Sequence, residues 1–179
     1  DLLNKILTAC PDTLSGARDA ALLSVGYETL CRSSELSWMQ VEHVQFERAL
    51  IYIPRAKNDP FGDGRLASIS DASQKRISIW LQGCKIDSGP LFRGLHTRSV
   101  SGSSLDTSSI RRIVKSAARR AGLNEEARSL SGHSMRIGAA QDLMKSGYNT
   151  IAIMKAGGWK SSDVVARYVE NAHTPFWNR

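Results

Sequence analysis

The apolar and polar positions change their period several times along the chain, and each change predicts a different element. Residues 1–30 follow helical spacing, which Pro11 and Gly16 interrupt, so two helices are predicted there. Either of the serines that follow, Ser33 or Ser34, is a suitable N-cap, which predicts a short third helix.

Between residues 41 and 70 the period falls to two, which is typical of short strands. The alternation predicts a small antiparallel sheet around a turn-rich loop at 58–64, whereas the Ser/Gly-rich segment 99–104 is predicted to be a loop. The strands are expected over 41–46, 49–54 and 65–70, and the later helices over 73–84, 107–121, 133–147, 150–156 and 164–169. The predicted fold class is therefore α+β, mainly α-helical, with one small three-stranded antiparallel sheet.

The composition is that of an ordinary globular domain. The chain has 179 residues, of which 41% are hydrophobic and 23% are charged, so one domain with a real core is expected. No apolar run approaches the ~20 residues that span a bilayer, and no signal peptide is recognised. The cysteines, Cys10, Cys31 and Cys84, are too few and too scattered for a disulfide framework or a zinc cluster, which favours a reducing cytoplasm.

The formal net charge of +7 lies wholly in the second half of the chain. Residues 1–90 hold 10 basic and 11 acidic side chains, whereas residues 91–179 hold 14 basic and 6 acidic side chains. Such an asymmetry favours a polyanionic partner, but by itself it does not distinguish a nucleic acid from an anionic membrane surface.

A run of positive charge lies on the helix predicted at 107–121. Three of its basic residues stand at i, i+4 and i+8 on one face, two more flank them, and no acidic residue falls between positions 111 and 120. Two interpretations stay open, a solvated surface or a helix that follows the phosphates of a nucleic acid. These residues are Arg111, Arg112, Lys115, Arg119 and Arg120.

Several other polar and aromatic residues have an ordinary structural interpretation when each is taken alone. A His-x-x-Arg pair is common on surfaces, an Arg three positions before a Glu is most often an ion pair, and a Trp or Tyr is most often a packing residue. Their order along the chain is more informative than any one of them. The residues are Arg32 with Glu35, Lys57, His133, Arg136, Trp159 and Tyr168.

In this order and spacing, the residues resemble the catalytic domain of the tyrosine recombinases of the phage integrase family. The resemblance is carried by the block Gly-His-Ser-Met-Arg at 132–136, by Ala-Gly-Gly-Trp at 156–159, and by the interval to Tyr168. Most members of the family have a histidine where this chain has Trp159. The resemblance implies that residues 1–179 form a single catalytic domain and that the N-terminal core-binding domain usual in the family is absent, so we expect a fragment.

The resemblance also implies a role for each residue. Arg32 and Arg136 would bind the non-bridging oxygens of one DNA phosphate, which suits their planar forks of donors. Trp159 would donate its indole N–H to one of those oxygens, since this group has no proton to lose. Glu35 would orient Arg32 or His133 rather than touch DNA.

The remaining roles concern the proton and the nucleophile. Tyr168 would attack the phosphorus, and His133 would act as base and later as acid, because its ordinary pKa lies near 6.5. Lys57 would protonate the departing 5′-oxygen. The products would be a 3′-phosphotyrosine and a free 5′-hydroxyl, formed without ATP, metal or other cofactor.

The partners that the resemblance implies are double-stranded DNA with a specific recombination site and further copies of the protein, in a tetramer on that DNA. Neither a membrane nor a small-molecule substrate is expected, and the location would be the cytoplasm, at the nucleoid, in a bacterial, phage or mobile-element setting. The basic helix would dock on DNA, and Phe176 and Trp177 would pack into a neighbouring protomer. Two alternatives stay open, an enzyme that only relaxes supercoils, as a type IB topoisomerase does, and a non-catalytic DNA-binding module.

Overall fold

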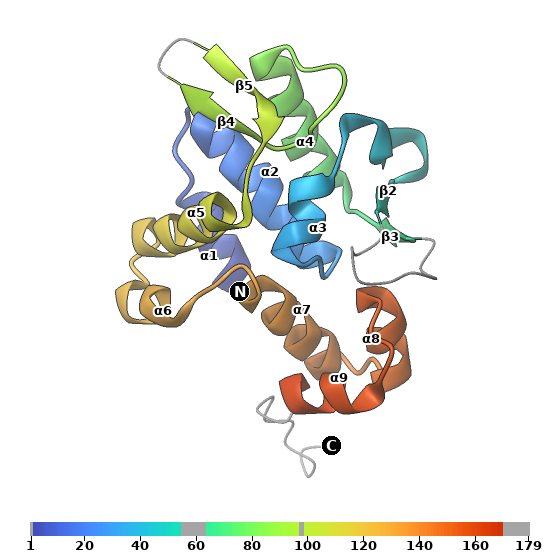
Figure 1. The fold of residues 1–179 in the computed structure, drawn as a ribbon. Coiled ribbons are helices and arrows are strands. Elements are labelled where there is room, and N and C mark those ends of the chain that lie inside the picture. The colour runs from blue at the N-terminus through green and yellow to red at the C-terminus, as the bar shows by residue number, and fades with distance from the viewer. Residues whose placement is uncertain (1, 55–63, 97–98, 170–179) are drawn as a thin grey trace.

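A long central helix, α2 (Leu14–Glu28), organises the fold (Figure 1). The computed structural model describes residues 2–54, 64–96 and 99–169, so Lys57, Phe176 and Trp177 lie outside the described residues. Helices α1 (Leu2–Thr8), α3 (Ser33–Trp38), α4 (Asp71–Cys84) and α5 (Thr107–Arg120) all contact α2. Their apolar faces form the main core, in which Leu22, Trp80 and Ile110 are fully buried.

The start of α2 corrects the sequence prediction. Gly16 does not end a helix but lies inside α2, whose N-cap is Thr13, with its hydroxyl accepting from the Gly16 N–H at 3.1 Å. A Cβ at Gly16 would lie 1.8 Å from the Pro11 carbonyl oxygen, so the glycine permits a close turn between α1 and α2. The predicted cap of α3 is also wrong, since Arg32 is the N-cap and Ser33 is already helical.

The predicted three-stranded antiparallel sheet is present, in the order β1-β2-β3. Its strands are β1 (Val44–Gln45), β2 (Leu50–Ile53) and β3 (Arg65–Ser68). The strand expected over 41–46 is mostly wrong, because 3₁₀ turns at Val41–His43 and Phe46–Arg48 leave only two residues paired. Ile51 and Ile53 of β2 point into the main core.

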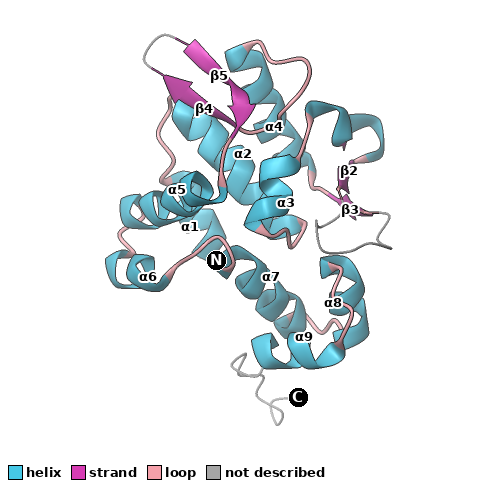
Figure 2. Ribbon diagram, in the orientation of Figure 1, coloured by secondary structure: helices cyan, strands magenta, loops and turns pink. Residues whose placement is uncertain are grey.

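A second sheet was not predicted. The segment 99–104 is not a loop but β5 (Ser99–Ser104), which pairs antiparallel with β4 (Arg93–His96), and Figure 2 shows this hairpin beyond α4. Because most of β5 is exposed and only Val100 packs against the core, no apolar alternation marks it in the sequence.

The C-terminal half of the fold forms a second, smaller core below the first in Figure 1. It is built by α7 (Ser134–Lys145), α8 (Thr150–Gly157) and α9 (Ser162–Val169), with Ala140, Ile153 and Val165 fully buried. The short helix α6 (Asn124–Ser129), which was not predicted, connects α5 to this region. Helix α8 ends as predicted, at Gly158, whose φ of +65° is left-handed.

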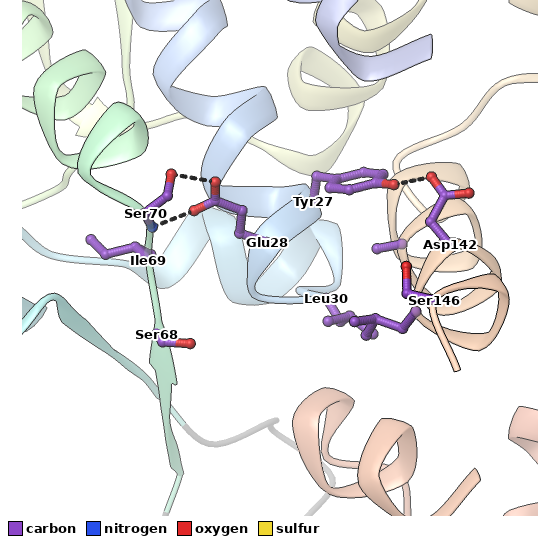
Figure 3. A pocket seen from close by; sticks show the side chains of 10 residues that line it. Tyr27, Glu28, Leu30, Ser68, Ile69, Ser70, Asp142 and Ser146 are labelled. Carbon is purple, nitrogen blue, oxygen red and sulfur yellow. Dashed lines mark hydrogen bonds between the residues drawn. The ribbon is translucent and has the colours of Figure 1, made fainter. Parts of the chain in front are cut away.

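Polar contacts at the end of α2 connect this helix to α7 and to the start of α4. Tyr27 donates a hydrogen bond to the Asp142 carboxylate on α7, and the Glu28 carboxylate accepts from the backbone and side chain of Ser70 (Figure 3). These contacts border a cavity of about 520 Å³ that also reaches Leu30, and none of the predicted catalytic residues within the described ranges lines it. None of the helices in the described part of the chain is long and apolar enough to cross a bilayer.

Helix α4 offers a matched test of the core. Ile77 is fully buried, whereas Ile79 on the same helix is 50% exposed. We expect Ile77→Ala to lower the free energy of unfolding by about 2–5 kcal/mol, since it removes buried methyl groups and leaves a cavity. Ile79→Ala should change it by no more than about 0.5 kcal/mol. Urea denaturation measures both values, and equal effects would contradict this assignment of the core.

Candidate active site

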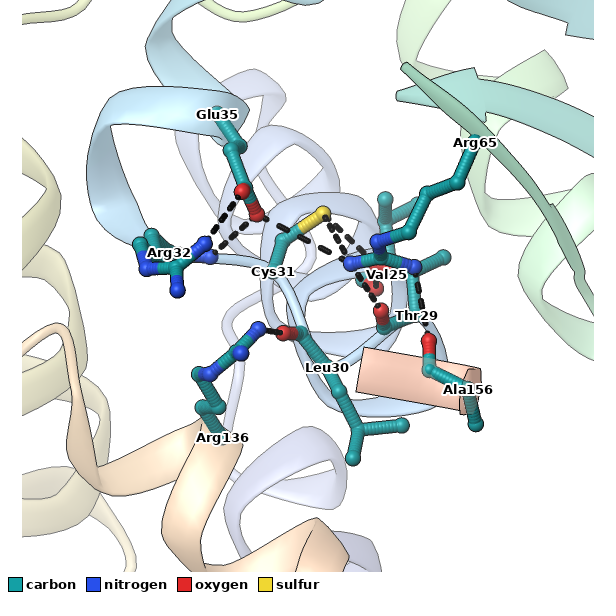
Figure 4. A network of polar contacts seen from close by, with 9 residues as sticks. All are labelled: Val25, Thr29, Leu30, Cys31, Arg32, Glu35, Arg65, Arg136 and Ala156. Atoms are coloured by element: carbon teal, nitrogen blue, oxygen red, sulfur yellow. Dashed lines mark hydrogen bonds and ion pairs between the residues drawn. The ribbon is translucent and has the colours of Figure 1, made fainter. Parts of the chain in front are cut away.

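The first part of the site is the connection between α2 and α3. The Arg32 backbone N–H donates to Glu35 Oε2 at 2.8 Å, and its guanidinium Nη1 donates to Glu35 Oε1, also at 2.8 Å (Figure 4). Glu35 is buried, at 4% exposure, whereas the side chain of Arg32 is 41% exposed. The buried carboxylate therefore fixes the orientation of a guanidinium that is open to solvent.

Arg136 on α7 is a fully buried arginine. Its Nη1 donates to the carbonyl oxygen of Leu30, and its guanidinium carbon lies 3.8 Å from the centroid of the Trp159 ring, a cation–π arrangement. Nε and Nη2 have no hydrogen-bond acceptor within the described parts of the chain. Two donors are thus left unsatisfied in a buried cation, which is unusual for a group present only for stability.

Burial and neighbouring positive charges lower the pKa values of two groups of the site, Arg136 and His133. Burial, and then the positive charge of Arg32, lower the pKa of Arg136 to about 10, so the group stays charged at neutral pH. Burial is also the main cause that lowers the pKa of His133, and the charges of Arg136 and Arg32 add to it. His133 is therefore neutral at pH 7 and able to accept a proton.

The turn before α7 brings these residues beside Arg32. A Cβ added to Gly132 would lie 1.7 Å from Ser33 Oγ, so this turn packs directly on the first residue of α3. The glycine that opens the Gly-His-Ser-Met-Arg block is thus required by the close approach of two segments about 100 residues apart.

His133 and Tyr168 are in direct contact. His133 Nε2 lies 2.8 Å from Tyr168 Oη, and the two rings meet edge to face, with their centroids 5.3 Å apart. Gln141 on α7 donates to the Tyr168 carbonyl at 3.0 Å, which attaches the end of α9 to α7. The distance between nitrogen and hydroxyl is short enough for direct proton transfer.

Trp159 connects the arginine to the tyrosine. Its ring centroid lies 6.0 Å from that of Tyr168, and it also contacts Arg136 and Gly157. A Cβ at Gly157 would lie 2.1 Å from the Trp159 ring, so the ring packs closely against that glycine. The two glycines before Trp159 thus have separate functions, since Gly157 makes room for the ring and Gly158 turns the chain.

The structure groups most of the predicted catalytic residues. Arg32 and Glu35 come from the α2–α3 connection, His133 and Arg136 from the start of α7, and the other two from α8–α9, while Lys57 lies outside the described residues. One charged residue at the site was missed by the sequence analysis, Arg65 at the start of β3. Its Nη2 lies 3.7 Å from Glu35 Oε2. An isolated arginine at the start of a strand carries no signal by itself.

The five basic residues of α5 differ in their surroundings. Arg111 and Arg119 are exposed, with no ion pair or side-chain hydrogen bond among the described residues. Arg120 pairs with Asp19 of α2 at 3.1 Å, so its charge is compensated by an acid distant in sequence. Lys115 Nζ donates to the Arg128 carbonyl at 2.9 Å, and Arg112 donates to Ser109 Oγ at 2.8 Å.

Comparison with known proteins agrees with this geometry. The family model of the phage integrase family matches residues 1–174. The chain belongs to the phage integrase family. An integrase/recombinase xerD homologue of Selenomonas ruminantium is 32% identical over 171 residues, which cover 90% of this chain and 50% of that protein. The Cre recombinase of Escherichia phage P1 is 27% identical over 175 residues, covering 89% of this chain and 51% of Cre.

Solved structures show the same fold. The chain superimposes on the XerA recombinase with a TM-score of 0.79 at 20% identity, over 98% of this chain and 58% of XerA. It superimposes on a XerH site-specific recombinase, in a post-cleavage complex with a palindromic difH substrate, with a TM-score of 0.75 at 21% identity, over 94% of this chain and 48% of XerH. This member of the phage integrase family spans about half the length of the curated relatives it matches.

The environment of His133 predicts its titration. Its ring should titrate below pH 6.5, and the neutral form therefore stabilises the fold above pH 6.5, a contribution that is lost as the pH falls through the lowered pKa. Arg32→Ala should raise the midpoint, because it removes a neighbouring positive charge. NMR titration of the ring measures this, with His133→Gln to assign the signal, and a midpoint at or above 6.5 in the unmodified chain would refute the assignment.

Proposed function

We propose that residues 1–179 form the catalytic domain of a site-specific DNA recombinase that cleaves and rejoins strands through a 3′-phosphotyrosine intermediate. The observation that carries the proposal is the contact of 2.8 Å between Tyr168 Oη and His133 Nε2, beside the buried and partly unsatisfied guanidinium of Arg136. A nucleophile, a neutral base and fixed cations in one place are the parts that phosphoryl transfer requires.

In the cleavage step, His133 Nε2 accepts the proton of Tyr168 Oη as that oxygen attacks the scissile phosphorus. A bond forms between Oη and phosphorus while the bond from phosphorus to the 5′-oxygen breaks, and the leaving oxygen takes up a proton. The family resemblance assigns that proton to Lys57. The 3′-phosphotyrosine keeps the energy of the phosphodiester, so a second strand's 5′-hydroxyl can reverse the step and release the tyrosine.

The cations act on the charge that develops on the phosphate. The exposed guanidinium of Arg32 and the unsatisfied Nε and Nη2 of Arg136 are suited to the two non-bridging oxygens. Trp159 is assigned a further N–H contact, and its ring keeps Arg136 in place. Glu35 positions Arg32 through two hydrogen bonds rather than touching the substrate.

Solved structures of similar proteins support a DNA substrate and an assembly of several copies. One solved neighbour is a XerH recombinase bound to its difH substrate, and another is a lambda integrase dimer bound to a core site. By this similarity we infer double-stranded DNA with a specific recombination site as the substrate, a tetramer as the active form, and the cytoplasm, at the nucleoid, as the location.

The rival functions have no specific observation in their favour. A non-catalytic DNA-binding module has no use for a tyrosine held against a neutral histidine. An enzyme that only relaxes supercoils would use the same chemistry, and the two differ in whether two DNA sites are joined.

Loss of the nucleophile should abolish cleavage without loss of binding. With the full-length protein and a randomised library of nicked duplexes, which trap the cleaved state, we expect a covalent protein–DNA product whose adduct maps to Tyr168 by mass spectrometry. Tyr168→Phe should give none, because it removes only the attacking oxygen, while retaining DNA affinity.

Tyr148→Phe is the matched control, since Tyr148 is 55% exposed and lies outside the site. Its product should equal that of the unmodified protein. A covalent adduct on any residue other than Tyr168, or its persistence in Tyr168→Phe, would refute the mechanism. The site selected from the library is then placed on two plasmids. Joining of the two plasmids shows recombination, whereas relaxation of supercoils needs only one plasmid.

We assign further contacts with DNA, next to the site, to the basic helix α5. Ser37 at the end of α3 donates to the Leu105 carbonyl at 2.6 Å, just before α5, and α3 and α5 pack together. The start of α5 therefore lies beside α3, the helix whose N-cap is Arg32. We assign Arg111 and Arg119 to phosphates, because they are exposed and have neither an ion pair nor a side-chain hydrogen bond among the described residues, with weaker contributions from Arg112, Lys115 and Arg120.

Reversal of charge at Arg111 and Arg119 should weaken DNA binding. Arg111→Glu with Arg119→Glu is expected to lower affinity and to reduce the slope of log K against log salt by about one for each residue. Lys75→Glu in α4, combined with Lys85→Glu directly after this helix, changes the net charge equally and should have a smaller effect. Fluorescence anisotropy at several salt concentrations measures both pairs, and equal losses would show that only the total charge matters.

A further inference from the structure

We propose that Arg65 is a positioning residue that fixes the two sides of the phosphate site, the Arg32 side and the Trp159 side, relative to one another. The inference rests on the proposed function and adds a residue to its machinery. Arg65 is the first residue of β3, where it pairs with Ile53 of β2, so its backbone is fixed by the sheet. Its side chain is only 17% exposed and extends from the sheet toward the site (Figure 4).

The guanidinium of Arg65 contacts three separate segments. Nη2 donates to the Thr29 carbonyl at 2.8 Å, at the end of α2, and Nη1 donates to the Ala156 carbonyl at 2.8 Å, in the last turn of α8. Nη2 also lies 3.7 Å from Glu35 Oε2 on α3. One side chain thus connects the sheet, both helices that flank Arg32, and the helix that precedes Trp159.

On one side of the site, Arg65 determines how the two carboxylate oxygens of Glu35 are divided between Arg32 and Arg65. Glu35 Oε1 accepts from the guanidinium of Arg32, whereas Oε2 accepts from the Arg32 backbone and faces Arg65. Without Arg65, both carboxylate oxygens would be available to the guanidinium of Arg32 as a two-bond pair. Such a pair would compete with the DNA phosphate for Arg32.

On the other side, Arg65 fixes the turn that carries Trp159. Its hydrogen bond to Ala156 precedes the two glycines directly, and a Cβ at Gly158 would lie 3.1 Å from Arg65 Cδ and Nε. The Trp159 ring that follows supports Arg136 at 3.8 Å. A shift of this turn would therefore move Arg136 relative to Arg32, and a misplacement of about 1 Å in an active site can cost 10²-fold in rate.

The geometry requires arginine rather than any cation. A lysine at position 65 would keep the charge but present one compact ammonium in place of the two separate nitrogens, Nη1 and Nη2, that bond the Ala156 and Thr29 carbonyls. The proposal therefore predicts a graded series, in which the cleavage rate falls from Arg through Lys to Gln.

The test measures covalent cleavage by the full-length protein on a nicked duplex, together with DNA affinity and thermal unfolding. We expect Arg65→Gln to lower the cleavage rate by about 10²-fold and Arg65→Lys by less, while DNA affinity changes by less than about threefold. Lys75→Gln, which removes an exposed cation of α4, should leave the rate unchanged. If Arg65→Gln does not fold, Arg65→Lys alone decides, by a reduced rate in a folded protein.

A double-mutant cycle separates positioning from general stability. If Arg65 acts through the Trp159 turn, the rate losses of Arg65→Gln and Trp159→Phe should be less than multiplicative when combined, whereas Arg65→Gln with Lys75→Gln should be multiplicative. Multiplicative losses in both pairs, or an Arg65→Gln rate equal to that of the unmodified protein, would overturn the proposal. Failure of the unmodified protein to form any covalent product would instead refute the proposed function.

Discussion

The buried guanidinium of Arg136 is the constraint on which the rest of the site depends. Burying a cation is costly unless its donors are satisfied and its surroundings are fixed. Here one donor is satisfied by the Leu30 carbonyl and the planar face by the Trp159 ring. Leu30 and Trp159 both pack in the smaller core of α7–α9, and Leu30 follows directly on α2, the central helix of the main core. Arg136 is therefore the joint between the smaller core and the segment that leaves the central helix, so that the contacts that pack these elements also place the group proposed to bind phosphate.

The glycines of the site follow from this joint. Gly132 allows the start of α7 to lie on Ser33, and Gly157 allows the Trp159 ring to approach the end of α8 closely. Neither glycine contributes a polar side chain. Both remove a Cβ at a place where two segments must approach closely enough for Arg32, Arg136 and Trp159 to meet.

The elements that the sequence predicts well are those with one buried face. Helices α4 and α5 show regular apolar spacing because their buried residues pack against the main core. Strand β5 was missed because it is mostly exposed, and Arg65 was missed because its partners are chiefly backbone carbonyls, which leave no mark on the sequence. The family resemblance predicted which residues form the candidate site. The contact between His133 and Tyr168, which are 35 positions apart, could be found only from the folded structure.

The positive charge of the chain has two different physical roles. Asp19 is buried between Arg18 and Arg120, at 2.7 and 3.1 Å, so part of the charge is compensated inside the fold. At the site, by contrast, Glu35 is shared by two guanidiniums, and a third, that of Arg136, lies close enough for Arg32 to lower its pKa. Like charges held together without enough counter-charge favour the arrival of an anion. The same repulsion would therefore favour binding of the phosphate of the proposed substrate.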